Sequence, residues 1–241
     1  MKKSTFLKIS LLAVLGLASV VFNACKDPDP KPSDTEQTTT NPSDPKPTDP
    51  SDPKPTDPSQ TNDGVVINGV KWATRNVDAF GTFAATPESA GMFYQWNRKK
   101  AWAATGTVTG WDATFPTGTT WEKANDPSPK GWRVPTKEEM NKLCDKTKVT
   151  NEWTTQNGVG GQKFTDKSTG ASVFFPAAGH RGYNDDDGAI TTAGEGGCYW
   201  SSTSYESNEF GAYHTSFYKG YATGVYDDGR NCGFSVRSVA E

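Results

Sequence analysis

A proline-rich tract divides this chain into a part that can fold and a part that cannot. Residues 26–62 contain ten of the sixteen prolines, and the octapeptide Ser-Asp-Pro-Lys-Pro-Thr-Asp-Pro occurs twice in succession, at 43–50 and 51–58. The tract has almost no apolar side chains to bury, so it cannot form a core. Proline at this density favours polyproline II, which rises about 3.1 Å per residue. We therefore expect a linker over residues 25–62 and one globular domain over residues 63–241.

The first 24 residues have the pattern of an export signal. Lys2, Lys3 and Lys8 precede an apolar run over residues 9–22, which is followed by small residues. The run is shorter than the roughly 20 apolar residues of a spanning helix. The sequence Val-Phe-Asn-Ala-Cys ends at Cys25 and resembles a bacterial lipobox. This resemblance implies that Cys25 becomes the first mature residue and that acyl chains on it anchor the protein in a membrane.

The residues after Cys25 bear on localisation. Lys26-Asp27-Pro28-Asp29 places acidic residues beside the anchor, which resembles the surface-export signal of Bacteroidetes lipoproteins. We expect an outer-membrane lipoprotein exposed at the cell surface. Two alternatives remain open: a lipoprotein facing the periplasm, and a soluble secreted protein with a free Cys25.

Residues 63–241 give little sign of enzymatic chemistry. They carry 20 acidic and 18 basic residues, so the basic patch that nucleic-acid binding usually needs is not expected. The Gly-x-Ser-x-Gly elbow of many hydrolases is absent from the sequence, and His180 and His214 are the only histidines. A lone histidine such as His180 is more often a structural residue than a base. We expect a protein that is not an enzyme.

Two local signals predict secondary structure. Thr136 and Glu139 have the spacing of a capping box after Pro135, which predicts a helix with Met140 and Leu143 on its buried face. Asn68-Gly69 between β-branched residues predicts a two-residue hairpin turn.

The remaining elements are mostly short strands. We expect residues 79–128, 151–170 and 180–197 to be loops. Strands are predicted over residues 70–77, 171–176, 198–203, 209–218, 221–226 and 233–239. One or two helices, a mostly antiparallel sheet and long loops correspond to the α+β class.

Six motifs, in this order, resemble the Fibrobacter succinogenes major paralogous domain, which is frequent in Bacteroidetes lipoproteins. They are Trp72-Ala73-Thr74-Arg75-Asn76, Met92-Phe93-Tyr94-Gln95-Trp96, Gly131-Trp132-Arg133-Val134-Pro135-Thr136, Pro176-Ala177-Ala178-Gly179-His180-Arg181, Tyr199-Trp200-Ser201-Ser202-Thr203 and Gly233-Phe234-Ser235-Val236-Arg237. The resemblance covers about residues 65–239. It implies a C-type-lectin-like fold, distantly related to the formylglycine-generating enzyme fold, with residues 70–77 beside 233–239.

Cysteines give a further comparison with that family. Its members often carry cysteines where this chain has Ser128 and Ser238, so the resemblance implies that the usual disulfide is missing. Cys198 and Cys232 each lie beside glycine near predicted strands, and we expect a bridge between them as a substitute. They are too far apart in sequence to suggest the closely spaced redox pair of a formylglycine-generating enzyme.

Aromatic residues in the predicted loops are the best candidates for ligand binding. Sugar rings stack on aromatic side chains, and lectin-like folds present ligands on loops. The candidates are Trp102, Trp111, Trp121, Tyr183 and Tyr205. We expect binding of a glycan or a partner protein, with a structural envelope component as the alternative and an enzyme as the least supported one.

An aspartate-rich turn is the one candidate metal site. Asp185, Asp187 and Glu195 could supply oxygen ligands to a structural Ca²⁺ ion, although the run does not have EF-hand spacing. A solvated turn explains the same residues, and no other cofactor is expected.

Overall fold

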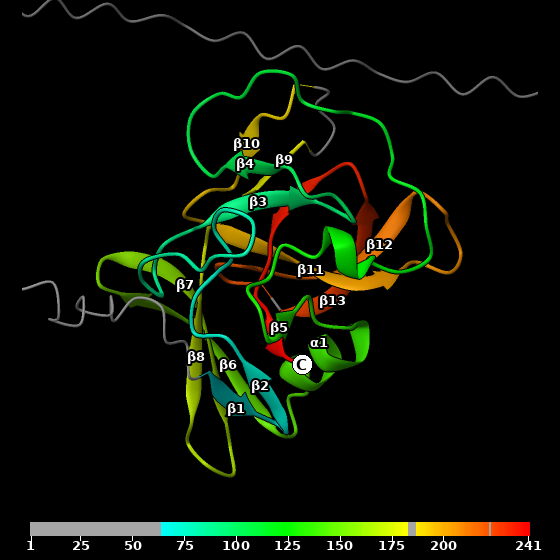
Figure 1. Cartoon of the computed structure of the whole chain (residues 1–241). Helices are drawn as coiled ribbons and strands as arrows, with labels where there is room; N and C mark the ends of the chain where they lie inside the picture. The colour runs from blue at the N-terminus through cyan, green and yellow to red at the C-terminus, as the bar shows by residue number, and fades with distance from the viewer. Residues whose placement is uncertain (1–63, 183–186, 222) are drawn as a thin grey trace, which may run out of the picture. The chain divides into compact units, whose positions relative to one another are not determined.

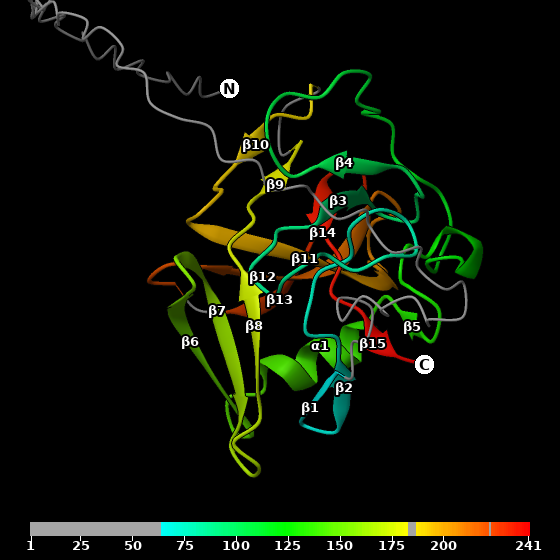
Figure 2. The ribbon, with the colours of Figure 1, turned by 60° about the vertical axis from the view of Figure 1, so that its left-hand side comes forward.

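The computed structural model describes residues 64–182, 187–221 and 223–241, which form several β-sheets around a short helix (Figure 1). The terminal sheet has the order β1 (Val65–Ile67), β2 (Val70–Trp72), β15 (Val239–Ala240) and β5 (Trp132–Arg133). The hairpin sheet consists of β6 (Val149–Gln156), β7 (Val159–Asp166) and β8 (Ser172–Pro176). Strand β1 contacts β7 and β8, so the terminal and hairpin sheets lie next to each other (Figure 2).

The central sheet is the largest. Its order is β10 (Ile190–Thr191), β9 (His180–Arg181), β14 (Gly233–Ser235), β11 (Gly196–Ser204), β12 (Gly211–Tyr218) and β13 (Gly224–Gly229). Strand β3 (Met92–Gln95) pairs with β14 and with β4 (Ala101–Ala103). The pairs are antiparallel except for β11 with β14, which is parallel.

The predicted α+β, C-type-lectin-like class is wrong, because this is a β-rich fold. Of the described residues, 42% lie in strands and 6% are helical, with a single α-helix. The error lies chiefly in residues 151–170, which form most of the β6–β7 hairpin instead of a loop. Asn157 and Gly158 make its turn with φ values of 47° and 84°. Both strands carry polar residues on both faces, so they lack the alternation that identifies a half-buried strand.

The two local predictions are confirmed. Helix α1 (Lys137–Cys144) begins after Thr136, whose side chain accepts from the Glu139 amide, while the Glu139 carboxylate accepts from the Thr136 amide. Its buried residues are Met140 and Leu143. The hairpin turn also forms, with φ values of 46° at Asn68 and 76° at Gly69.

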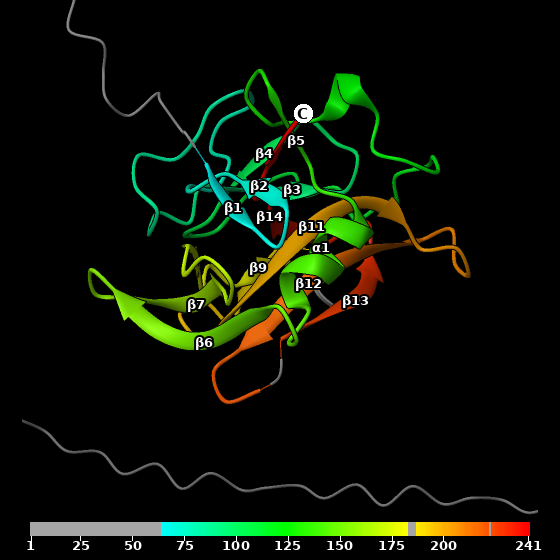
Figure 3. The ribbon, with the colours of Figure 1, turned by 90° about the horizontal axis from the view of Figure 1, so that it is seen from below.

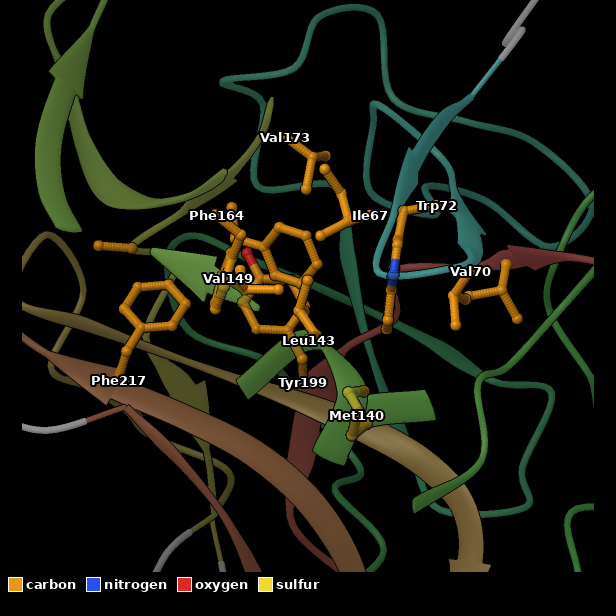
Figure 4. Packing of buried hydrophobic residues seen from close by; sticks show 13 residues of the cluster. Ile67, Val70, Trp72, Met140, Leu143, Val149, Phe164, Val173, Tyr199 and Phe217 are labelled. Carbon is orange, nitrogen blue, oxygen red and sulfur yellow. The ribbon is translucent and has the colours of Figure 1, made fainter. Parts of the chain in front are cut away.

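Strand β11 separates two hydrophobic clusters, because successive side chains point to opposite faces of a sheet. Tyr199 points to the face on which α1 lies across β11, β12 and β13 (Figure 3), and it packs there with Met140 and Phe217 (Figure 4). Cys198 and Trp200 point to the other face and join a second cluster. This arrangement buries β11 on both sides.

The two ends of the described chain are paired, as the resemblance implied. Val239 lies opposite Trp72, and the amides of Ala73 and Val77 donate to Ser238 and Val236 across 2.9 Å each. The predicted strands are interrupted, however. The strand expected over residues 70–77 ends at Trp72, and the one expected over 233–239 divides into β14 and β15.

Buried arginines hold the long loops against the sheet. Arg181 is fully buried and donates to the carbonyls of Ala103, Thr105, Gly106 and Gly188 at 2.6–3.0 Å. The carbonyl groups of the segment after β4 thereby have fixed hydrogen-bond donors, although this segment has no regular secondary structure.

No helix among the described residues has the length and apolar character needed to cross a membrane.

Candidate functional site

A groove of about 460 Å³ lies where the C-terminal strand meets β5. We call it the Trp121–Trp132 groove. It is lined by Trp121, Lys123, Asp126, Ser128, Pro129, Lys130, Gly131, Trp132, Arg133, Val134, Ser202 and Glu241. These residues come from the segment just before the 3₁₀ helix η2 (Lys123–Asn125), from η2 and the loop that follows it, from β5 and the residue after it, from β11 and from the last residue of the chain.

Two indole rings form the aromatic part of the lining. Trp121 is 8% exposed, packs edge-on against Trp96 with centroids 5.9 Å apart, and donates from its indole nitrogen to the Asn125 carbonyl across 3.0 Å. Trp132 is half-buried and packs edge-on against Phe83 at 5.6 Å. The orientation of each ring in the groove is therefore fixed by its contacts with neighbouring residues.

Hydrogen bonds set the shape of the loop between η2 and β5. The Asp126 carboxylate accepts from the Ser128 and Val134 amides across 2.8 and 2.9 Å. The Trp132 amide donates to the Pro129 carbonyl at 3.0 Å, and the Glu241 amide donates to Gly131 at 3.1 Å. The loop is thus tied both to itself and to the C-terminal residue.

Some of the charged side chains in the groove form ion pairs within the protein, and one does not. Arg133 donates two hydrogen bonds to Glu139, at 2.8 and 2.7 Å. Burial raises the pKa of Glu139, but the bonds from Arg133 and the Thr136 amide outweigh it, and the net shift is downward. Lys123 lies 3.2 Å from the Glu241 carboxylate. Lys130 is exposed and forms no ion pair with any described residue, so its ammonium is available to a ligand.

This lining is suited to binding. It contains no histidine or cysteine, and its Ser128 hydroxyl already accepts a hydrogen bond from Ser238. The groove combines aromatic surface with a few convergent polar groups, which is the usual make-up of a small-ligand site.

The predicted aromatic residues do not converge on one site. Trp102 and Trp111 contact each other with centroids 4.8 Å apart, and Trp102 is 3% exposed. Tyr205 packs edge-on against Tyr213 at 5.3 Å, away from the groove. Trp121 lines the groove, whereas Tyr183 lies outside the described residues. Trp102 and Trp111 therefore serve in packing.

Trp111 occupies a space made by glycines. A Cβ at Gly182, Gly188 or Gly233 would collide with its indole ring. The three glycines come from the segments after β9, before β10 and at the start of β14. Trp111 thus fastens its loop to the central sheet.

The predicted metal ligands and disulfide are not assembled in the structure. Asp185 lies outside the described residues, Asp187 accepts from the Ala189 amide at 2.9 Å, and Glu195 is exposed. No set of three or more His, Cys, Asp or Glu among the described residues is arranged to hold a metal ion. Cys198 and Cys232 share a buried cluster but are free thiols, so the expected bridge is not present. Cys25 also lies outside the described residues.

The sequence reading missed most of the groove. Trp72, Trp132 and Trp200 each belong to one of the six motifs, but they differ in burial. Trp72 and Trp200 are fully buried, whereas Trp132 is only partly buried and lines the groove. Pro127, Pro129 and Gly131 interrupt the chain just before Trp132, and this break was the available signal that its ring would lie at a surface turn.

No curated protein and no solved structure matches this chain. Residues 148–239 match a family described as a domain of unknown function (DUF8237). The matched segment runs from β6 to β15 and includes Ser202, whereas most of the groove precedes it.

Proposed function

We propose that this chain is a lipid-anchored cell-surface protein whose domain, residues 63–241, binds a glycan in the Trp121–Trp132 groove without catalysing a reaction. The observation that carries the proposal is the groove itself, in which two braced indole rings lie beside polar groups.

The size and make-up of the groove support a sugar ligand. Its volume of about 460 Å³ falls within the roughly 300–1,000 Å³ of small-ligand sites. Aromatic rings offer a flat apolar surface to the C–H face of a sugar, while polar groups at their edges bind hydroxyls. Lys130 and the Asp126 carboxylate would supply a donor and an acceptor at those edges.

The sequence before the domain supports exposure at a distance from the membrane. A linker of this composition would extend up to roughly 100 Å from an anchor on Cys25. Such a tether suits a domain that must reach polymers outside the cell.

Glycan binding can be tested with the full chain in detergent on an array of polysaccharides. We expect one class of glycan to bind, and Trp132→Ala to reduce its affinity at least tenfold, which is about 1.4 kcal/mol. Trp153→Ala is the matched control, because Trp153 is also a half-buried indole but lies in the hairpin sheet.

A second variant guards against misfolding. Lys130 is exposed and has no ion-pair partner among the described residues, so Lys130→Ala should fold normally and still weaken binding several-fold. Lys148→Ala, also at an exposed lysine, should not weaken it. Absence of binding to every polysaccharide, together with a stable complex isolated from membranes, would instead favour the structural role.

The anchor has its own test. Replacing Cys25 by alanine should move the protein from the membrane fraction to the soluble fraction. If the variant stays with membranes after a high-salt wash, the lipid-anchor proposal is wrong.

A further inference from the structure

A second pocket, of about 220 Å³, lies on the face of the central sheet opposite α1. It is lined by His180, Cys198, His214, Ser216, Tyr218, Tyr226, Asp227 and Asp228, none of which belongs to the Trp121–Trp132 groove. We call it the Asp228 pocket. Both histidines of the chain and two of its four cysteine positions lie in or beside it.

Strand register explains why these residues meet. Cys198 lies opposite Ser216, and His214 lies opposite Tyr226. Directly paired residues project to the same face of a sheet, and every second residue does so along a strand. Asp228 therefore shares this face with Tyr226, while Asp227 is paired with Tyr213 and alternates to the other face.

The pocket has carboxylates in its lining that no lysine or arginine among the described residues neutralises. The Asp228 carboxylate accepts from the Gly229 amide at 2.7 Å and forms no ion pair with a described residue. Burial, with a smaller effect from Asp227, raises the pKa of Asp228. Among the described residues, no lysine or arginine lines the pocket. Burial lowers the pKa of both His180 and His214, the latter to about 3, so neither supplies positive charge at neutral pH.

One polar atom in the lining is unsatisfied. His214 is 4% exposed, and its Nδ1 atom is buried with no hydrogen-bond partner among the described residues. A buried polar group left in this state destabilises the folded protein. A neutral imidazole has one nitrogen that accepts a hydrogen bond, so a ligand with N–H donors would remove that destabilisation.

We infer that the Asp228 pocket binds a primary ammonium group. Such a group has a positive charge and three donors, which match the Asp228 carboxylate, the His214 imidazole and the hydroxyls of the lining. The Tyr226 ring beside them adds cation–π attraction. The volume is below the roughly 300 Å³ at which pockets for larger ligands begin, so it suits one ammonium-bearing ring or side chain.

An organic cation fits this lining better than a metal ion. The described residues hold no set of three His, Cys, Asp or Glu placed to coordinate one. The thiol of Cys198 is instead 3.8 Å from both His180 Nδ1 and the Tyr218 hydroxyl, which are weak contacts within the protein.

Two natural sources carry this chemistry, an amino sugar and a lysine side chain. Calorimetry or NMR titration of the full chain in detergent should use glucosamine and Nα-acetyl-lysine amide, with N-acetylglucosamine and Nα,Nε-diacetyl-lysine amide as their uncharged counterparts. We expect at least one amine to bind, and its acetylated counterpart to bind at least tenfold more weakly. The amine that binds more tightly identifies the source.

Variants locate the binding to this pocket. Asp228→Asn keeps the size of the side chain and should weaken binding at least tenfold, whereas Glu152→Gln, at an exposed carboxylate of the hairpin sheet, should change it less than twofold. If Asp228→Asn does not fold, Tyr226→Ala replaces it, because Tyr226 is 48% exposed and its loss should still weaken binding about threefold through the cation–π term.

Three results would overturn the inference. They are no binding of either amine, equal binding of an amine and its acetylated counterpart, and unchanged binding by folded Asp228→Asn. Trp132→Ala should leave amine binding unaltered, so failure of this inference and failure of glycan binding can be told apart.

Discussion

The Ser238 hydroxyl donates a hydrogen bond to the Ser128 hydroxyl across 2.7 Å, although 110 residues separate the two positions. The contact joins the loop before β5 to the C-terminal segment and lies beside the Trp121–Trp132 groove. Members of the family that this chain resembles often carry cysteines at these two places, and the structure brings the two serine side chains together.

This contact predicts that a disulfide can be introduced. The double variant Ser128→Cys/Ser238→Cys should oxidise in air and gain about 2–4 kcal/mol in free energy of unfolding, because the bridge closes a long loop in the unfolded chain. Urea unfolding with and without reductant measures the gain, and Ser128→Cys alone is the control. An oxidised sample in which both new thiols stay free would refute the prediction.

The buried guanidinium of Arg181 predicts a large loss of stability on substitution. Arg181→Met removes donors from four carbonyls, and each acceptor left buried costs about 1–3 kcal/mol. We expect the free energy of unfolding of this variant, measured in urea, to fall by more than about 2 kcal/mol. Lys163→Met should cost less than about 1 kcal/mol, because it breaks only the exposed pair with Glu152. Equal losses for the two variants would contradict this account of Arg181.

Asp166 predicts a pH-dependent contribution to stability. Its carboxylate accepts from the Ser168 hydroxyl at 2.6 Å and from the Asn68 and Ser168 amides at 2.7 and 2.8 Å, which lowers its pKa to about 2. The unfolded pKa is about 3.9, so the stabilisation is complete above that value and is lost as the pH falls toward the folded pKa.

The matching experiment is urea unfolding at pH 7, 4 and 2. Asp166→Asn should have a lower urea midpoint than the wild type at pH 7, and the difference should shrink by pH 2. Glu122→Gln, at an exposed site, should show no such convergence. A difference for Asp166→Asn that is independent of pH would mean that the charge of the carboxylate is unimportant.

The thiols predict a labelling pattern that also tests the expected disulfide. Burial raises the pKa of Cys144 to about 11 and that of Cys198 to about 12, and it raises that of Cys232 as well. Thiolate is the reactive form, so a thiol reagent at pH 8 should label these three slowly in the folded protein and quickly in urea. If Cys144 is the only one of the three that reacts in urea without reductant, Cys198 and Cys232 are bridged after all.

Local chemistry accounts for what could be read from the sequence. The Asn68-Gly69 turn and the Thr136–Glu139 capping box each depend on residues within four positions of one another, so contiguous sequence was sufficient to predict them. The pairing of residues 70–77 with 233–239 came from the family resemblance. The β6–β7 hairpin was missed because its strands are stabilised by pairing with each other and with β8, and their residues do not alternate.

The candidate sites depended even more on packing. Of the predicted aromatic residues, Trp121 lines the groove, while Trp102 and Trp111 found burial partners in each other. The sequence does not distinguish a loop aromatic residue that packs against the protein from one that could contact a ligand. The same holds for Asp228 and His214, whose shared pocket follows from strand register alone.

The sequence by itself determined that a proline-rich segment cannot form a core, and it predicted a short capped helix and a tight hairpin. Propensity and composition act over a few residues, which is why these features needed no distant partner. Only the tertiary structure decided that the fold is β-rich, that Trp132 faces a groove, and that Asp228 lies in a pocket without a cation. Those outcomes depend on which distant segments pair, and pairing is governed by the burial that the whole chain achieves together.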